Sequence, residues 1–583
     1  MPTWIRSLIF PLLIASFIAF SFVPTFYEIG RRSDIPTNRS FELIHNYYTD
    51  YNFYLSRIRE GFEGRLTVVE RYTSEAHAGS LIQVMYLGLG WLGRVVPDAA
   101  FAVPGMYHVA RAVFGIVLLW LVAVFVKRHF SVSFPVQILA FLTAVTASSY
   151  PVIVPVTSSG VRFGGHMPWW TMMDSLIRMT FIPHILLGQA LMIALIIGVG
   201  DMRLLSKSGN WIWFGVFSLI LGLIFPPGLV FVDFVIAFLI LIEILGDRNL
   251  LLFEPKKRIS WIMSHIAPRV FIVIMGLPTI VYFQLMFSVY PWKRLVEFDA
   301  MHPITFSYIE YAKALGLTLP LGILGLLLVV IRGDKAFKQP VAWVVAWIFC
   351  LWIFQYIPQQ SPLRFSEMMP HVPLAVLSVY LYMQVFTAVK SLIQKHASPI
   401  KKTGAVSTPT WGHIVYMMLY ILVLLPVGLG IFFLYSMWLW QKDFYDQKIR
   451  AGWPYVSMDN YIVYPARGFT DMMRYIDART PKDAIFLGDL SAGNYIPAMT
   501  GRTVYVGHEN TVKKEEKLAE SKFLLSGNMT IDQSLEFLKR HQISYIFFGP
   551  QERAYNPETD LLKSYPFLKI DQQNGDVTLY KVE

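Results

Sequence analysis

Asp50 is the residue of this sequence best suited to acid–base chemistry, because it opens a short amphipathic segment between two apolar runs. A carboxylate held near a substrate can accept a proton as a general base. The segment 50–61 predicts a helix that ends near Gly61. Its apolar residues recur at the i, i+3, i+4, i+7 spacing of one helical face: Tyr51, Tyr54, Leu55 and Ile58. The structural alternative is an N-cap, formed by Asp50 or by Thr49.

The same polar stretch contains three further groups suited to binding. Glu75 and His77 stand two residues apart among small residues, where they either contact a polar substrate or remain solvated in a loop. Arg57 lies in the predicted helix. A guanidinium group matches a phosphate with two parallel hydrogen bonds, which makes Arg57 a candidate for phosphate binding.

Other polar groups stand beside later apolar runs. Arg364, in the Gln-rich loop 355–367, is the first candidate for a lipid phosphate, and Arg162 and Arg57 come second. His166 and Asp174 follow Arg162 closely and are added as substrate-binding candidates. A charge at membrane depth costs about 2.5–3.5 kcal/mol, so each such residue needs a partner or a wet cavity. Extension of the side chain to the membrane interface is the alternative for each of them.

Long apolar runs must position these groups. A helix rises 1.5 Å per residue, so about 20 apolar residues cross a hydrocarbon layer about 30 Å thick. Eleven runs of roughly that length predict a polytopic, mainly α-helical membrane bundle: 4–26, 104–126, 134–155, 176–199, 211–227, 229–246, 267–289, 312–331, 340–357, 369–389 and 412–437. The run 81–96 is short and contains three glycines, so we expect a re-entrant or interfacial helix there.

The distribution of basic residues predicts the orientation of the bundle. Lysine and arginine are concentrated in alternate loops: 127–133, 200–210, 247–266, 332–339 and 390–411. The positive-inside rule places these loops and the N-terminus in the cytoplasm. The large first loop, 27–103, and the C-terminal tail then lie on the extracytoplasmic side. The same rule accounts for the net charge of +11 without nucleic acid as a partner.

The composition changes after the last apolar run. Residues 438–583 read as an extracytoplasmic α/β domain, and residues 1–437 as the membrane domain. Cys350 is the single cysteine and lies in an apolar run, which excludes an intrachain disulfide framework and a cysteine-cluster metal site.

With one span before it and many after it, the Asp50-Tyr51 pair resembles the acidic motif, often Asp-Glu, of the GT-C superfamily of membrane glycosyltransferases. The protein mannosyltransferase and aminoarabinose-transferase branches are the most similar. The resemblance implies a polyprenyl-phosphate-linked sugar as donor, Asp50 as catalytic base, and an arginine near the outer end of a late span, here Arg364, for the donor phosphate. Tyr51 replaces the second acidic residue, so no metal ligand is assigned, and a requirement for a divalent metal stays open.

The predicted function is therefore an inverting sugar transfer, in a plasma membrane of bacterial type, to a glycan, lipid or protein acceptor. The alternative is a polytopic transporter or lipid flippase without transferase chemistry. Asp233 and the break at Pro226–Gly228 are the features that such a protein would use. An inactive scaffold or sensor with the same fold is a third hypothesis.

Overall fold

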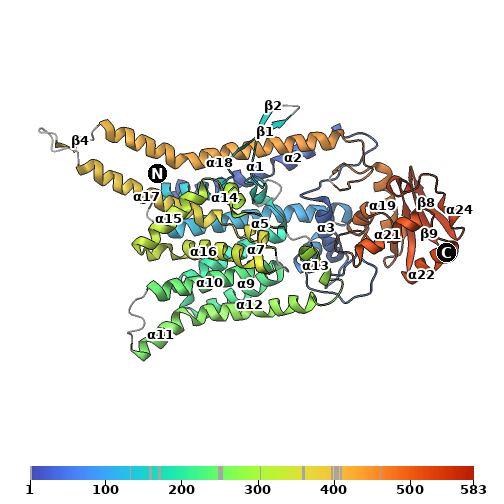
Figure 1. Ribbon diagram of the computed structural model, residues 1–583, viewed down its shortest axis with the longest axis horizontal. Coiled ribbons are helices and arrows are strands. Elements are labelled where there is room, and N and C mark those ends of the chain that lie inside the picture. Colours follow the sequence, from blue (N-terminus) through green and yellow to red (C-terminus); the bar gives the residue numbers. More distant parts are fainter. Residues whose placement is uncertain are drawn as a thin grey trace.

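The computed structural model describes residues 3–131, 133–156, 160–167, 173–246, 254–301, 304–357, 361–395, 398–399, 406–407, 410–459 and 461–583. A bundle of long helices forms one end of the molecule, and a small α/β domain forms the other (Figure 1). The N-terminus lies at the end of the bundle away from that domain, together with α11 (Pro255–His265) and β4 (Val406–Ser407).

Each of the eleven predicted spans corresponds to an apolar helix. Within the described ranges, eight helices are long and apolar enough to cross a membrane. These are α1 (Thr3–Ser21), α5 (Ala99–His129), α7 (Pro183–Gly200), α10 (Pro226–Gly246), α12 (Ala267–Met286), the continuous helical run Lys335–Tyr356 that contains α16 (Lys338–Ile353), α17 (His371–Lys395) and α18 (Thr410–Arg450). The protein is thus a multi-pass membrane protein, as the sequence predicts.

The other three predicted spans correspond to shorter or bent helices. Helices α6 (Phe134–Thr146) and α9 (Ser208–Ile224) fall below the length of the eight long helices. Helices α14 (Tyr308–Leu315) and α15 (Thr318–Arg332) meet at an angle of 97°. Shorter elements join the spans: α2 (Val23–Gly30), η1 (Arg32–Asp34), η3 (Ile177–Thr180), α8 (Met202–Leu205), α13 (Lys293–Met301), η5 (Lys335–Phe337), η6 (Phe354–Tyr356), η7 (Pro362–Met368), and the hairpins β1 (Val152–Val156)–β2 (Gly160–Gly164) and β3 (Ser398–Pro399)–β4.

The first loop folds around two helices in close contact, α3 (Tyr48–Phe62) and α4 (Val84–Gly93). Helix α4 corresponds to the short run 81–96, and its ten residues rise only about 15 Å, too little to cross a bilayer. A Cβ on Gly61 would lie 2.1 Å from the Leu87 carbonyl oxygen, and a Cβ on Gly90 would lie 2.1 Å from that of Ile58. Glycine is therefore required where the two helices cross. Gly61 does not end α3, which continues to Phe62.

The C-terminal domain contains a five-stranded sheet in the order β6-β5-β7-β9-β8. Strand β5 is parallel to β6 and β7, whereas β9 is antiparallel to β7 and β8. The strands are β5 (Ile485–Leu487), β6 (Thr503–Val504), β7 (Ile543–Phe548), β8 (Leu568–Asn574) and β9 (Val577–Val582). The helices are α19 (Arg467–Arg479), α20 (Leu490–Thr500), α21 (Lys514–Leu525), α22 (Ile531–Arg540), α23 (Pro550–Arg553) and α24 (Leu561–Ser564).

The C-terminal domain and the first loop share one hydrophobic core. Tyr51, Leu55 and Ile58 of α3 belong to the same buried cluster as Phe469 and Ile496 of the domain. The α3 face predicted from helical spacing is therefore buried, but against the C-terminal domain as well as against the bundle. Helix α18 also joins the two parts, because it runs without a break past residues 437/438, where the sequence places the domain boundary.

Candidate functional site

Asp50 is the third residue of α3 and does not cap it. The N-cap of α3 is Tyr47, which makes no side-chain hydrogen bond to the helix. Among the residues that the structure describes, none donates a hydrogen bond to the Asp50 carboxylate, and the residue is partly exposed. Burial among its neighbours raises the pKa of this carboxyl to about 6, while the charge of Arg364 acts in the opposite direction. Asp50 is thus a carboxylate with its acceptor positions open.

Arg364 lies in η7, between α16 and α17, and its side chain is 41% exposed. Its guanidinium nitrogens lie 3.6 Å from the Asp299 carboxylate and 4.0 Å from that of Glu367. Both distances exceed that of a good hydrogen bond, so the N–H groups of Arg364 are not fully used by these partners. Burial raises the pKa of Glu367 to about 7, with Arg364 opposing the rise and Asp299 adding to it.

Tyr54 stands one helical turn after Asp50. Burial raises the pKa of its hydroxyl, the charges of Asp50 and Glu367 add to the rise, and the charge of Arg364 opposes it. Its ring stacks on that of Tyr86 from α4, with the centroids 4.8 Å apart. The Tyr86 hydroxyl lies 2.9 Å from Nδ1 of His184, at the start of α7. Residues from α3, α4 and α7 therefore meet here, and η7 also contacts α7.

Helix α13 brings Asp299 to this cluster. At the start of α13, the Arg294 guanidinium donates to the Glu509 carbonyl oxygen at 3.1 Å and pairs with Glu515 at 3.3 Å. Its other end carries Asp299, which faces Arg364. The C-terminal domain thus helps to position the carboxylate beside Arg364. Sequence reasoning did not single out Asp299 as a site residue.

Arg57, in contrast, is enclosed. Its side chain is fully buried, pairs with Glu60 at 3.2 Å and Glu70 at 2.7 Å, and lies over the ring of Phe53. A guanidinium with two carboxylates and no exposure has no room for a lipid phosphate. We therefore leave Arg57 out of the proposed site.

The side chains of Glu75 and His77 make contacts that fix the conformation of the first loop. Glu75 pairs with Lys517 of α21 at 2.7 Å. His77 uses both ring nitrogens, since Nε2 accepts from the Glu70 backbone N–H at 2.8 Å and Nδ1 donates to the Glu75 carbonyl at 2.7 Å. Both side chains are occupied in joining the first loop to itself or to the C-terminal domain.

Arg162 and His166 lie along other helices. Arg162 pairs with Asp443 of α18 at 2.5 Å and donates to the Leu439 carbonyl oxygen at 2.9 Å. Nδ1 of His166 lies 3.5 Å from the Glu310 carboxylate of α14. No contact among the described residues joins either side chain to Asp50 or Arg364.

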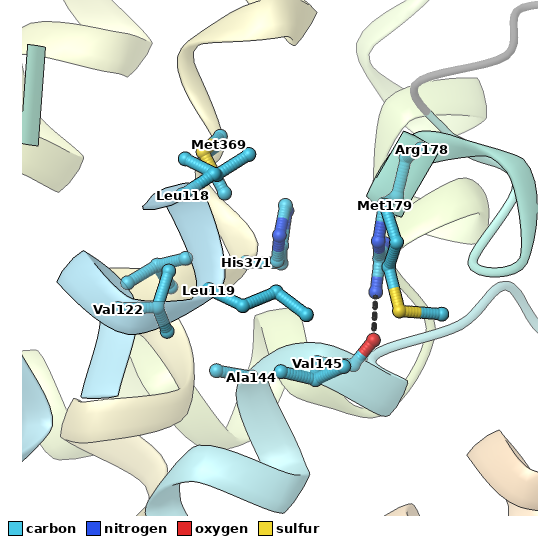
Figure 2. A pocket seen from close by; sticks show the side chains of 10 residues that line it. Leu118, Leu119, Val122, Ala144, Val145, Arg178, Met179, Met369 and His371 are labelled. Carbon is cyan, nitrogen blue, oxygen red and sulfur yellow. Dashed lines mark hydrogen bonds between the residues drawn. The ribbon is translucent and has the colours of Figure 1, made fainter. Parts of the chain in front are cut away.

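Asp174 holds the turn before η3, and the nearby Arg178 lines a separate internal cavity. The Asp174 carboxylate accepts from the backbone N–H groups of Leu176 and Ile177, at 2.7 and 3.1 Å. Arg178 and His371 face a cavity of about 20 Å³ inside the bundle, where Arg178 donates to the Val145 carbonyl oxygen (Figure 2). This volume holds one water molecule and is too small for a sugar.

A larger cavity lies next to the start of η7. It has a volume of about 440 Å³ and adjoins η7 at Pro362. Its lining mixes apolar and polar side chains: Thr305, Phe306, Ser307, Tyr308, Tyr311, Leu351, Gln355 and Pro362. Gln359 and Gln360, which contribute to the Gln-rich character of the loop, lie outside the described residues. Within the described ranges, no group of three or more histidine, cysteine or acidic residues is arranged to hold a metal ion.

No family model matches the sequence, and no curated protein matches it. Among solved structures, AglB, the oligosaccharyltransferase of Archaeoglobus fulgidus, in complex with an inhibitory peptide and a dolichol-phosphate, is similar over 97% of this chain and 73% of that chain, with a TM-score of 0.51 and 10% identity. The Archaeoglobus fulgidus oligosaccharyltransferase tethered with an acceptor peptide matches over 95% and 72%, with a TM-score of 0.49 and 11% identity. ArnT from Cupriavidus metallidurans bound to undecaprenyl phosphate matches over 97% of each chain, with a TM-score of 0.47 and 12% identity.

The similarity to AglB covers the membrane bundle and the C-terminal domain together. At 10% identity it establishes the fold and nothing finer. The fold expected from the resemblance is found: this chain has a fold similar to that of the membrane oligosaccharyltransferase AglB.

Proposed function

We propose that this protein is a membrane glycosyltransferase that moves a sugar from a polyprenyl-phosphate donor to an acceptor on the extracytoplasmic side. The proposal rests on Asp50, which accepts no hydrogen bond from the described residues, and on Arg364, a half-exposed arginine whose charge lowers the pKa of Asp50. The GT-C fold supports the proposal, because AglB of that fold binds dolichol-phosphate.

Asp50 is the proposed general base. The acceptor nucleophile, a hydroxyl in the simplest case, transfers its proton to the Asp50 carboxylate while its oxygen bonds to the anomeric carbon of the sugar. The bond from that carbon to the phosphate oxygen breaks, and its electron pair leaves with the polyprenyl phosphate. Attack opposite the leaving group inverts the anomeric configuration. A carboxyl with a pKa of about 6 is ionised at neutral pH and still basic enough to accept a proton.

Arg364 is the proposed receiver of the leaving phosphate. Its N–H groups are only loosely engaged by Asp299 and Glu367, so a phosphate can bind them with two hydrogen bonds. Fixed donors that meet developing negative charge lower the barrier, and removal of one such donor typically slows turnover about 10²–10³-fold. The cavity beside η7 offers room for the first isoprene units, because its lining is mixed in polarity.

The sidedness follows from the basic residues. Helix α11 and strand β4, which belong to two of the lysine-rich segments, lie at the end of the bundle opposite the C-terminal domain (Figure 1). The positive-inside rule then favours a cytoplasmic N-terminus and an extracytoplasmic site. The proposed acceptor is a glycan, a lipid or a protein. The domain boundary at 437/438 is still a prediction, and the requirement for a divalent metal is still open.

Donor consumption by the purified protein tests the proposal. Full-length protein in detergent is incubated with a panel of polyprenyl-phosphate sugars, with and without a chelator, and the release of polyprenyl phosphate is measured by mass spectrometry. We expect release from at least one donor and loss of that release in Asp50→Asn. Movement of a lipid across proteoliposomes without cleavage of any donor would favour the flippase alternative instead.

A further inference from the structure

A second polar cavity lies at the opposite end of the bundle from Asp50. Its volume is about 540 Å³, within the range of small-ligand sites. The end of α5, the junction of α7 with α8, and the turn before α16 form its walls. Its polar and small lining residues include Arg128, Ser131, Asp201, Arg203, Ala336 and Gln339.

Cations exceed carboxylates around this cavity. Arg128 and Arg203 share the single carboxylate of Asp201, at 2.8 and 3.3 Å. Arg128 is 35% exposed and Arg203 is 93% exposed, so both can turn toward an anion. Asp201 is the one carboxylate among the described residues that line the cavity, so it balances the charge of only one of the two arginines.

A second group near the cavity also has two cations that share one carboxylate. Glu243 is shared by Arg269, at 2.5 Å, and by Lys338. Lys338 stands beside Gln339, which lines the cavity. Arg269 is fully buried and Lys338 is 23% exposed, so this second group adds one positive charge in excess near the cavity.

Helix α11 adds an independent observation. It packs against α8, whose Met202 and Arg203 line the cavity. Ile259, Ile262 and Met263 form a stripe at i, i+3 and i+4, and they are 60%, 40% and 57% exposed. The neighbouring first turn presents exposed lysines, Lys256 and Lys257. An exposed apolar stripe with lysines beside it is the pattern of a helix that lies in the headgroup layer of an anionic membrane.

We propose that this end of the bundle binds an anionic phospholipid: the cavity between Arg128 and Arg203 holds the headgroup phosphate, and α11 lies on the same leaflet. The chemistry is that of a phosphodiester with acyl chains anchored in the bilayer. Basic pockets between helices at a membrane surface recognise such headgroups, and each cation near the surface strengthens the attraction. The site is separate from Asp50 and does not depend on the proposed transfer.

Lipid-specific quenching tests the proposal on the full-length protein. A fluorophore is attached at Ala336→Cys in a Cys350→Ala background, in phosphatidylcholine nanodiscs doped with spin-labelled phosphatidylglycerol or with the same amount of spin-labelled phosphatidylcholine. We expect preferential quenching by phosphatidylglycerol, roughly fivefold for each cation that contacts the phosphate. A fluorophore at Leu285→Cys, an exposed position at the other end of α12, should show no preference.

Variants that remove positive charges distinguish binding in this cavity from a general attraction of anionic lipid to a positively charged protein. Arg128→Gln with Arg203→Gln should abolish the preference at position 336, whereas Lys563→Gln with Lys569→Gln in the C-terminal domain should preserve it. Lys256→Gln with Lys257→Gln should move a fluorophore at Met263→Cys into a wetter environment. Equal quenching by the two lipids in the native background would overturn the proposal. So would loss of the preference on adding millimolar inorganic phosphate, because the site would then be one for a free anion.

Discussion

The positive charge of Arg364 acts on the Asp50 carboxyl and lowers its pKa, although Asp50 lies in the first loop and Arg364 between two late spans. Burial raises the same pKa and is the larger influence, so the carboxyl titrates near 6. A base and a phosphate-binding group that affect each other in this way are suited to one reaction centre. The electrostatic relationship also makes the proposed chemistry testable through its pH dependence.

Replacement of Asp50 by asparagine should abolish transfer. We expect turnover to fall about 10²–10⁴-fold, the usual contribution of a general base, while donor binding stays within a few-fold of the native value. Binding is measured with a fluorescent polyprenyl-phosphate analogue, and transfer by product mass. Asp471→Asn, on the exposed surface of α19, is the matched control and should be fully active.

The activity should depend on pH through Asp50. Only the ionised carboxylate accepts a proton, so turnover should fall as the pH drops below about 6, by about tenfold for each further pH unit. The midpoint of the acid limb is read from initial rates at saturating donor. An acid limb centred near pH 4 would mean that Asp50 is solvated as an ordinary aspartate and is not the buried base.

Removal of Arg364 should have two separable effects. Arg364→Gln should slow transfer about 10²–10³-fold and move the acid limb to higher pH, because the charge that lowers the pKa of Asp50 is lost. Arg364→Lys should restore the position of the limb but only part of the rate, since an ammonium lacks the planar fork. Arg474→Gln, on an exposed helix face, controls for loss of charge. If the acid limb of the pH profile stayed in place in Arg364→Gln, Arg364 would not influence the pKa of Asp50.

Much of this arrangement can be predicted from the sequence. Hydropathy locates all eleven apolar segments, since a run of apolar residues needs no knowledge of its neighbours. Helical spacing gives α3 and its buried face. Arg364 could be picked because it stands in a Gln-rich loop at the end of a span, and a guanidinium binds a lipid phosphate with two hydrogen bonds.

The partners of the candidate residues could not be predicted. Arg57 resembles a phosphate ligand in sequence, but folding brings Glu70 to within 2.7 Å of it. Asp299 gains its place beside Arg364 because α13 is held by Glu509 and Glu515 of a distant domain. These contacts depend on tertiary packing, which no local pattern encodes.

Asp50→Asn should also change the pH dependence of stability. The folded pKa of about 6 exceeds the ordinary 3.8, so the stability linked to this group is full below pH about 4 and is lost as the pH rises through about 6. Asparagine carries no charge to bury. The variant should therefore melt at a higher temperature than the native protein at pH 7 and show no such gain at pH 4. The measurement is thermal unfolding in detergent at both pH values.

Two glycine substitutions in α4 should differ in their effect on the packing of α3 against α4. A Cβ at Gly90 would lie 2.1 Å from the Ile58 carbonyl oxygen, whereas a Cβ at Gly88 would meet nothing within 4 Å. We expect Gly90→Ala to destabilise the protein by about 1–3 kcal/mol and to reduce transfer, because Tyr86 would be displaced from Tyr54. Gly88→Ala should match the native protein. Comparable melting temperatures for the two variants would contradict this packing.

Helix α18 has a consequence for any attempt to separate the two parts of the protein. Beyond residue 437 it carries Lys448, whose ammonium donates to the buried Glu28 at 2.6 Å, and Tyr464 donates to the same carboxylate at 2.9 Å. A truncation at the predicted boundary would remove both donors and leave the Glu28 carboxylate buried without a partner. A buried, unpaired charge is strongly disfavoured. The membrane domain therefore needs residues of the C-terminal part to complete its buried hydrogen bonds. A chain truncated at residue 437 should aggregate rather than fold with reduced activity.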